Sequence, residues 1–151
     1  MTKIKICGLR REQDIRYANE LMPDYIGFVF LKGKMRYVTF EEAAHLRSLL
    51  DPAIPAVGVF VNEPAENVIR LLQAGTIQIA QLHGQEDEAY IEELRRAGDH
   101  CIIRAFAVRS SEDIHRAFAF PADYPLLDNG KGTGETFDWS LFQEQEKPFF
   151  L

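Results

Sequence analysis

The sequence predicts an α/β fold built on a parallel sheet. Short apolar runs of strand length alternate with segments of helical periodicity along the chain, and that alternation is typical of successive βα units. No linker, low-complexity tract or charge block interrupts it. With 151 residues, 46% of them hydrophobic, the chain is long enough for one domain with a real core and too short for two, so we expect a single domain over 1–151.

The predicted strands and helices follow one another in order. Seven segments have the composition of buried strands, namely 3–7, 25–30, 56–61, 77–82, 101–107, 125–128 and 148–151. The turn at Gly8 leads from the first strand into a helix. Later helices are expected from Thr39 to about Leu50, from Pro64 to Gly75, from Asp87 to Ala97 and after Ser111.

Helix signals are clearest after the second strand. Thr39 and Glu42 form the pattern of a capping box, in which each side chain satisfies a backbone amide of the other. Apolar residues then recur on one side of the predicted helix, at Ala43, Leu46, Leu49 and Leu50. Pro64 suits the first turn of the following helix, and Gly75 is a stop signal.

Composition excludes several functional classes. The formal net charge is −6 and no basic stripe occurs, which argues against nucleic acid as a partner because phosphate binding needs clustered cations. The longest uncharged apolar stretches are only strand-sized, so no membrane span is expected. The N-terminus lacks the apolar core of a signal peptide, and we expect a cytoplasmic protein.

Two strand ends carry the strongest candidates for chemistry. Cys7 closes the first strand and Asp128 the sixth, and α/β enzymes keep their reactive groups at the carboxyl ends of strands. Each has a structural alternative: a free cysteine is commonly a small buried hydrophobe, and an aspartate here can bind the amides of the following turn. The helix after Gly8 favours a thiolate at Cys7.

Four further residues are weaker candidates. Arg36 follows the second strand, where a solvated loop arginine is the simplest interpretation, and His83 ends the fourth, where a structural histidine is the alternative. Arg104 lies within the fifth strand, so it must face a barrel interior or pair with an acid. Asn62 is expected to cap the next helix. The Gly-Thr-Gly turn at 132–134 is not assigned to phosphate binding, because an isolated glycine pair is a weak signal for it. We predict a mobile loop there.

The histidines and cysteines indicate no metal. Four histidines and two cysteines show no ligand spacing, so no metal site is predicted. Cys7 closes one strand whereas Cys101 opens another, so in a parallel sheet the two would lie at opposite ends and a disulfide between them is not expected.

Periodicity leaves two architectures open, because a parallel sheet can close into a barrel or remain open and doubly wound. The open, flavodoxin-like alternative would bind a phosphate ligand at a sheet switch point and needs a phosphate-binding loop after the first strand. The segment 7–11, Cys-Gly-Leu-Arg-Arg, is a poor loop of that kind.

Five motifs also carry a resemblance. They are KICGL at 5–9, RYVT at 36–39, VGVFVN at 57–62, QLHG at 81–84 and LLDNGKGTGETFDW at 126–139. In this order and spacing the chain resembles the phosphoribosylanthranilate isomerases of tryptophan biosynthesis. It departs from the family pattern at Lys34, where serine is usual, and at Lys131, where glycine is common.

The resemblance implies a (βα)8 TIM barrel, of which 1–151 covers about six βα units and strand seven. It implies an Amadori rearrangement of a phosphorylated sugar-anthranilate without a cofactor, with Cys7 as general base and Asp128 as general acid. Arg36 is implied to bind the anthranilate carboxylate, and His83 and Arg104 are held as further substrate contacts. Such barrels usually bind a substrate phosphate with the loops that follow strands seven and eight. We therefore also expect a homo-oligomer or a complementing chain, with an inactive fragment or scaffold as the alternative function.

Overall fold

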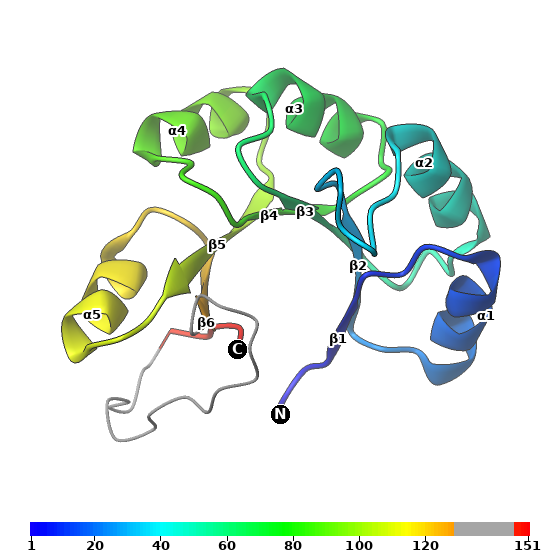
Figure 1. Cartoon of the computed structure of the whole chain (residues 1–151), viewed down its shortest axis with the longest axis horizontal. Helices are drawn as coiled ribbons and strands as arrows, with labels where there is room; N and C mark the ends of the chain where they lie inside the picture. The colour runs from blue at the N-terminus through cyan, green and yellow to red at the C-terminus, as the bar shows by residue number, and fades with distance from the viewer. Residues whose placement is uncertain (129–146) are drawn as a thin grey trace.

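The computed structural model describes residues 1–128 and 147–151, and its centre is one curled parallel sheet (Figure 1). The strands are β1 (Lys5–Cys7), β2 (Tyr25–Val29), β3 (Ala56–Phe60), β4 (Ile79–Leu82), β5 (Cys101–Ala107) and β6 (Tyr124–Asp128). Each strand pairs in parallel with the next one along the chain, so the order in space is the order in sequence. The predicted strand positions are confirmed to within two residues for these six.

The helices cover only the convex side of the sheet (Figure 1). They are α1 (Glu12–Leu21), α2 (Phe40–Leu49), α3 (Ala65–Gln73), α4 (Glu88–Arg96) and α5 (Ser111–Ala119). A doubly wound sheet would place helices on both faces and reverse its strand order at a switch point. The flavodoxin-like alternative is therefore wrong, and the described part of the chain has the topology of a barrel wall.

Local sequence explains how α2 begins, and it corrects one expectation. The Thr39 hydroxyl accepts from the Glu42 amide at 3.1 Å and the Glu42 carboxylate accepts from the Thr39 amide at 2.7 Å, which is the predicted capping box. Ala43 and Leu46 are buried as expected, but Leu49 is 43% exposed. Leu50, which was also expected on this side, is buried and lies four residues after Leu46.

The core has two layers, one on each side of the sheet. The larger layer joins the outward side chains of the strands to the helices, for example Phe60 and Leu82 to Leu71 and Leu94. The smaller layer fills the concave side, with Val57, Ile79, Ile103, Ala105 and Leu126 at its centre. Burial on both faces explains why these strands are nearly continuous apolar runs.

The seventh predicted strand is reduced to a single bridge. Phe150 forms an isolated parallel bridge with Leu126, in which its amide donates to the Pro125 carbonyl at 2.9 Å and its carbonyl accepts from the Leu127 amide at 2.9 Å. The prediction of a strand over 148–151 is thus correct in position and wrong in extent. The predicted loop at 132–134 lies outside the described residues.

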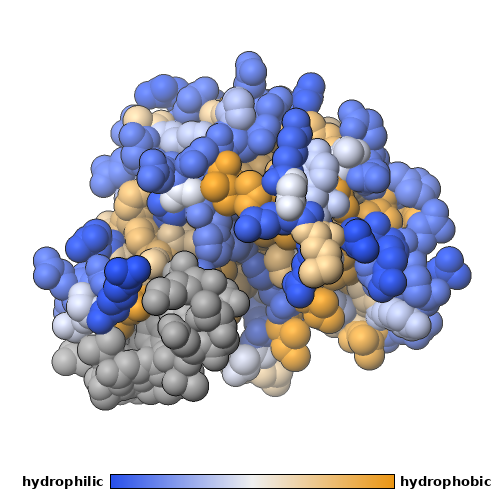
Figure 2. Space-filling view, viewed as in Figure 1, coloured by the Kyte–Doolittle hydropathy of each residue, from blue (hydrophilic) through white to orange (hydrophobic). Residues whose placement is uncertain are grey.

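Apolar side chains are exposed beside β1. Ile4 lies just before β1, Ile6 on the strand, and Tyr17 and Leu21 on α1. These side chains are between 38% and 71% exposed, and Figure 2 shows apolar surface over these elements. A cavity of about 650 Å³ opens there, and its lining includes Ile6, Tyr17 and Leu21 together with Cys7 and Arg36. Within the described residues, no helix is both long and apolar enough to span a membrane.

Candidate active site

Cys7 ends β1 on the concave side of the sheet, facing β2. Its register partner is Gly27, and a Cβ built on Gly27 would lie 2.7 Å from the Cys7 Sγ. Only a glycine leaves room for the thiol there, because real Cβ atoms essentially never approach so closely. Sequence reasoning missed Gly27, and its only signal was a lone glycine within an apolar strand, which often marks a close approach.

Arg36 comes to Cys7 from the loop between β2 and α2. Its Nη1 donates to the Cys7 carbonyl at 3.1 Å. Gly8, at a φ of +89°, makes this approach possible, since an added Cβ would lie 2.2 Å from the Arg36 Cδ. Among residues 1–128 and 147–151, no carboxylate forms an ion pair with Arg36.

His83 and Asp128 meet at the carboxyl ends of β4 and β6. His83 Nε2 and Asp128 Oδ2 are 2.9 Å apart, and both side chains are about one-third exposed, at 37% and 33%. The amide of His83 donates to the Phe60 carbonyl at 2.8 Å, which holds the residue at the end of its strand. The structure thus brings two predicted site residues into direct contact, 45 residues apart in sequence.

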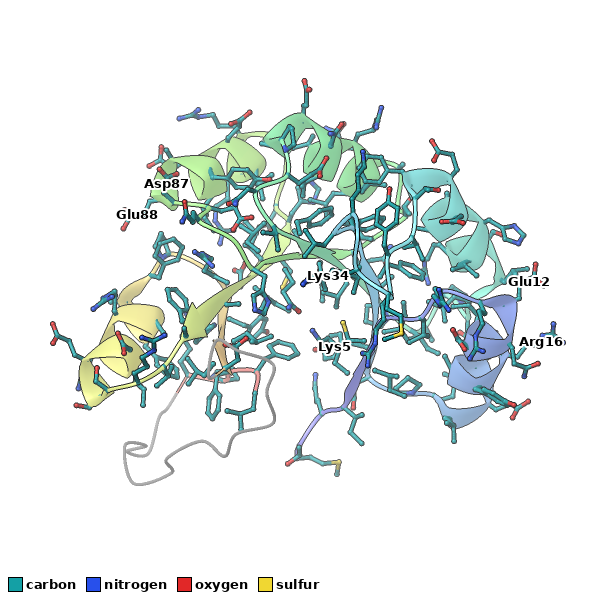
Figure 3. The ribbon with its side chains drawn as sticks, in the orientation of Figure 1. Lys5, Glu12, Arg16, Lys34, Asp87 and Glu88 are labelled. Atoms are coloured by element: carbon teal, nitrogen blue, oxygen red, sulfur yellow. The ribbon has the colours of Figure 1, made fainter. Side chains whose placement is uncertain are left out.

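Two polar residues below His83 were missed by the sequence analysis. Gln81 is buried, and its Nε2 lies 3.3 Å from His83 Nδ1, while Lys5 Nζ donates to Gln81 Oε1. Figure 3 shows Lys5 inside the curve of the sheet, whereas Glu12 and Asp87 lie outside it. Alternation along a strand was the available signal, since Lys5 and Gln81 are two residues from Cys7 and His83 and so share their face.

Arg104 does not join this group. Its register partner is Leu82, whose side chain packs on the helix side of the sheet. The guanidinium donates to the carbonyls of Gly84 at 2.9 Å and Glu86 at 3.1 Å, and it lies 5.3 Å from the Phe106 ring centroid. The expectation of an interior position is wrong, because backbone carbonyls and aromatic rings satisfy the cation on the helix side of the sheet. Burial lowers the pKa of Arg104, whereas the charge of one acid, Glu86, raises it, without an ion pair between the two among the described residues.

Asn62 also differs from its expectation, because α3 is preceded by Pro64 and not capped by Asn62. Asn62 has a backbone φ of +53°. Its side-chain Oδ1 accepts from the Gln85 backbone amide at 2.7 Å, and its backbone amide donates to Glu86 Oε1 at 2.6 Å. Asn62 therefore ties the loop after β3 to the loop after β4. Together with Arg104, these contacts fix the backbone that follows His83.

The two cysteines have different surroundings, and both are free thiols. Cys101 begins β5, where burial raises the pKa of its thiol to about 11. At pH 8 about one Cys101 in a thousand is then a thiolate, the form that reacts with alkylating agents.

We therefore expect iodoacetamide at pH 8 to modify Cys7, which lines the open cavity, well before Cys101. Peptide mapping by mass spectrometry after a short exposure measures this order directly. The Cys7→Ser variant serves as the control and should remain almost unlabelled over the same interval. Equal labelling of Cys101 would contradict its assigned burial.

No metal-binding arrangement was found in the described part of the chain. Among residues 1–128 and 147–151, no three side chains of histidine, cysteine, aspartate or glutamate lie close enough together to hold an ion. The site therefore consists of a thiol, a carboxyl and an imidazole, with a guanidinium beside the thiol. Such a set can move protons and bind an anion.

Comparison with known proteins decides the family. The family model for N-(5'phosphoribosyl)anthranilate (PRA) isomerase matches residues 4–151. The chain belongs to this family. The N-(5'-phosphoribosyl)anthranilate isomerase of Endomicrobium trichonymphae is 45% identical over 156 residues, an alignment that covers 100% of this chain and 76% of the relative.

Solved structures of the family agree with the fold. The phosphoribosyl anthranilate isomerase of Thermus thermophilus superposes with a TM-score of 0.80 at 33% identity, covering 93% of this chain and 69% of that one. A second isomerase, solved with reduced 1-(o-carboxyphenylamino)-1-deoxyribulose 5-phosphate, gives 0.78 at 33% identity, covering 93% and 68%. The predicted TIM-barrel class is confirmed, with about six βα units in the described residues. The roles of individual site residues remain predictions.

Proposed function

We propose that this chain catalyses the Amadori rearrangement of N-(5-phosphoribosyl)anthranilate to 1-(2-carboxyphenylamino)-1-deoxyribulose 5-phosphate. The family match over 4–151 carries the reaction. The proposed assignment of Cys7 and Asp128 is supported by their positions, since both end strands on the concave side of one curled sheet. A base and an acid at the same rim of a barrel can act on one small substrate.

In the proposed mechanism Asp128 first protonates the ring oxygen of the ribose. The C1–O bond breaks, and the lone pair of the anthranilate nitrogen forms a protonated imine at C1. The Cys7 thiolate then removes the proton from C2, and the C–H electrons neutralise the imine as an enolamine, which tautomerises to the C2 ketone. The substrate nitrogen serves as the electron sink, so the mechanism assigns no step to a metal or an organic cofactor.

Arg36 and His83 are proposed to bind substrate around this pair. The planar guanidinium of Arg36 matches a carboxylate in two-point geometry, and its place beside Cys7 would bring the anthranilate end close to the base. His83 is proposed to support the acid, because it contacts Asp128 at 2.9 Å. For Arg104 we propose a positioning role in place of substrate contact, since its hydrogen bonds hold the loop after β4.

Product identity tests the proposal. Incubation with N-(5-phosphoribosyl)anthranilate is expected to replace the anomeric proton signal by a C1 methylene and a C2 ketone carbon in the NMR spectrum. The substrate can instead break down to free anthranilate and ribose 5-phosphate, which a parallel sample without protein measures. If protein only accelerates that breakdown, or changes nothing, the proposed reaction is overturned.

A scaffold function, in which the chain associates with a second copy, is favoured by a separate observation. The exposed apolar side chains of β1 and α1 adjoin a strand that pairs only with β2 among the described residues. Light scattering should then show association that rises with concentration and falls in Leu21→Glu, a change at a position that is 71% exposed. A monomer at every concentration would remove this function. Cytoplasmic location stays a prediction from the sequence.

A further inference from the structure

We propose that Lys5 and Gln81 are positioning residues that fix which nitrogen of His83 carries its proton, and thereby direct the transferable proton of Asp128 to Oδ1. The inference rests on the proposed role of Asp128 as the acid. Its basis is a continuous chain of contacts through the concave side of the sheet, from Lys5 through Gln81 and His83 to Asp128.

The direction of this chain follows from its first member. A lysine ammonium has only donors, so the Gln81 side chain must turn its carbonyl oxygen toward Lys5. The amide nitrogen of Gln81 then faces His83 and donates to Nδ1 across 3.3 Å. An Nδ1 that accepts a hydrogen bond carries no proton, so the neutral imidazole is protonated at Nε2.

The ring of Phe150 favours the charged form of Lys5, on which this direction depends. Its Nζ lies 5.7 Å from the centroid of the Phe150 ring, a position that favours a cation over the ring face. Burial lowers the pKa of Lys5 and so acts against the charged form, whereas the charge of Cys7 raises the pKa and acts for it. Gln81 is only 3% exposed, so water does not compete for its amide and its orientation depends on its neighbours.

The consequence falls on the acid. The N–H at Nε2 of His83 points at Asp128 Oδ2, 2.9 Å away, so that oxygen must act as an acceptor. When Asp128 is protonated, its proton therefore sits on Oδ1. After the proton has passed to substrate, the hydrogen bond from His83 becomes a charge-assisted one to the new carboxylate, and this stabilises the state that forms during reaction.

The opposite tautomer shows why the chain matters. With its proton on Nδ1, His83 would face the Gln81 amide donor with another donor, and its bare Nε2 would attract the Asp128 proton to Oδ2. The Asp128 proton would then be donated to His83 and would not be available to the substrate. Lys5 and Gln81 disfavour this arrangement by donor and acceptor matching alone, without touching the substrate.

The test is the imidazole nitrogen spectrum of the whole chain labelled with ¹⁵N-histidine, with the His83 signals assigned by their loss in His83→Asn. The expected result is an unprotonated Nδ1 and a protonated Nε2 in the neutral ring. A neutral His83 protonated at Nδ1 would overturn the inference. This measurement is made on the unaltered chain, with His83→Asn used only to assign the signals, and it needs no turnover, so it is independent of whether the proposed reaction is correct.

Three variants sharpen the test. Gln81→Glu places a pure acceptor opposite Nδ1 and should draw a proton onto that nitrogen, whereas Gln81→Met, of similar shape, should leave a mixture of tautomers. Lys5→Met should also leave a mixture of His83 tautomers. It should lower kcat about tenfold at unchanged KM, which is less than the full contribution of a general acid because the acid itself is retained. Folded Gln81→Glu and Lys5→Met variants with the wild-type tautomer and kcat would overturn the inference.

Discussion

Asp128→Asn is expected to lower kcat by about 10²-fold to 10⁴-fold with KM little changed, the usual contribution of a positioned general acid. An amide keeps the shape of the carboxyl and can still meet His83, whose contact with Asp128 measures 2.9 Å. It cannot release a proton to the ring oxygen at neutral pH. Steady-state rates followed by the loss of anthranilate fluorescence measure the effect.

A matched control is Asp123→Asn, at the residue before β6. Asp123 accepts from the Ile102 amide at 2.7 Å and pairs with Arg95 at 3.2 Å. It lies at the amino ends of the parallel strands, whereas His83 lies at their carboxyl ends. Its loss should lower the free energy of unfolding while kcat of the folded protein stays near wild type. Similar kcat losses in both variants would mean that the Asp128 effect is structural.

Gly8→Ala is expected to weaken both the fold and substrate binding. A residue with a side chain at a φ of +89° is destabilised by about 1–2 kcal/mol, and the new Cβ would lie 2.2 Å from the Arg36 Cδ. Arg36 must then leave its position over the Cys7 carbonyl. If Arg36 binds the anthranilate carboxylate, KM should rise about tenfold or more, the worth of one charge-assisted hydrogen bond.

Gly75→Ala separates the two effects. Gly75 follows α3 at a φ of +71°, and an added Cβ there would meet nothing within 4 Å. Thermal unfolding should therefore show a similar loss of stability in both variants, whereas only Gly8→Ala should raise KM. An unchanged KM in Gly8→Ala would remove Arg36 from the proposed substrate contacts.

Much of the sheet was predictable because its strands are buried on both faces. Runs such as 56–61 and 101–107 carry too few charges to be surface elements, and their lengths fit strands. The same burial hid which alternate residues face the concave side. Arg104 was therefore expected in the interior, although Ile103 and Ala105 occupy it.

The sequence predicted the site residues that end strands, but not the polar residues within the strands. Cys7 and Asp128 were marked by their place at strand ends, and His83 by the same rule. Lys5 and Gln81 share the face of Cys7 and His83, but a lone lysine or glutamine in a short strand reads as an edge or surface residue. Only the folded structure, in which β1, β4 and β6 face one another across the concave side, reveals that their side chains form one series of hydrogen bonds.

The turnover of N-(5-phosphoribosyl)anthranilate by the 151-residue chain, measured beside Cys7→Ser, tests the central claim most directly. The account predicts saturable turnover in the wild type and a loss of about 10²-fold or more in kcat when the thiol is replaced by a hydroxyl, a much weaker base. Undiminished turnover in a fully folded Cys7→Ser protein would contradict the account, because no other described residue is assigned the proton at C2.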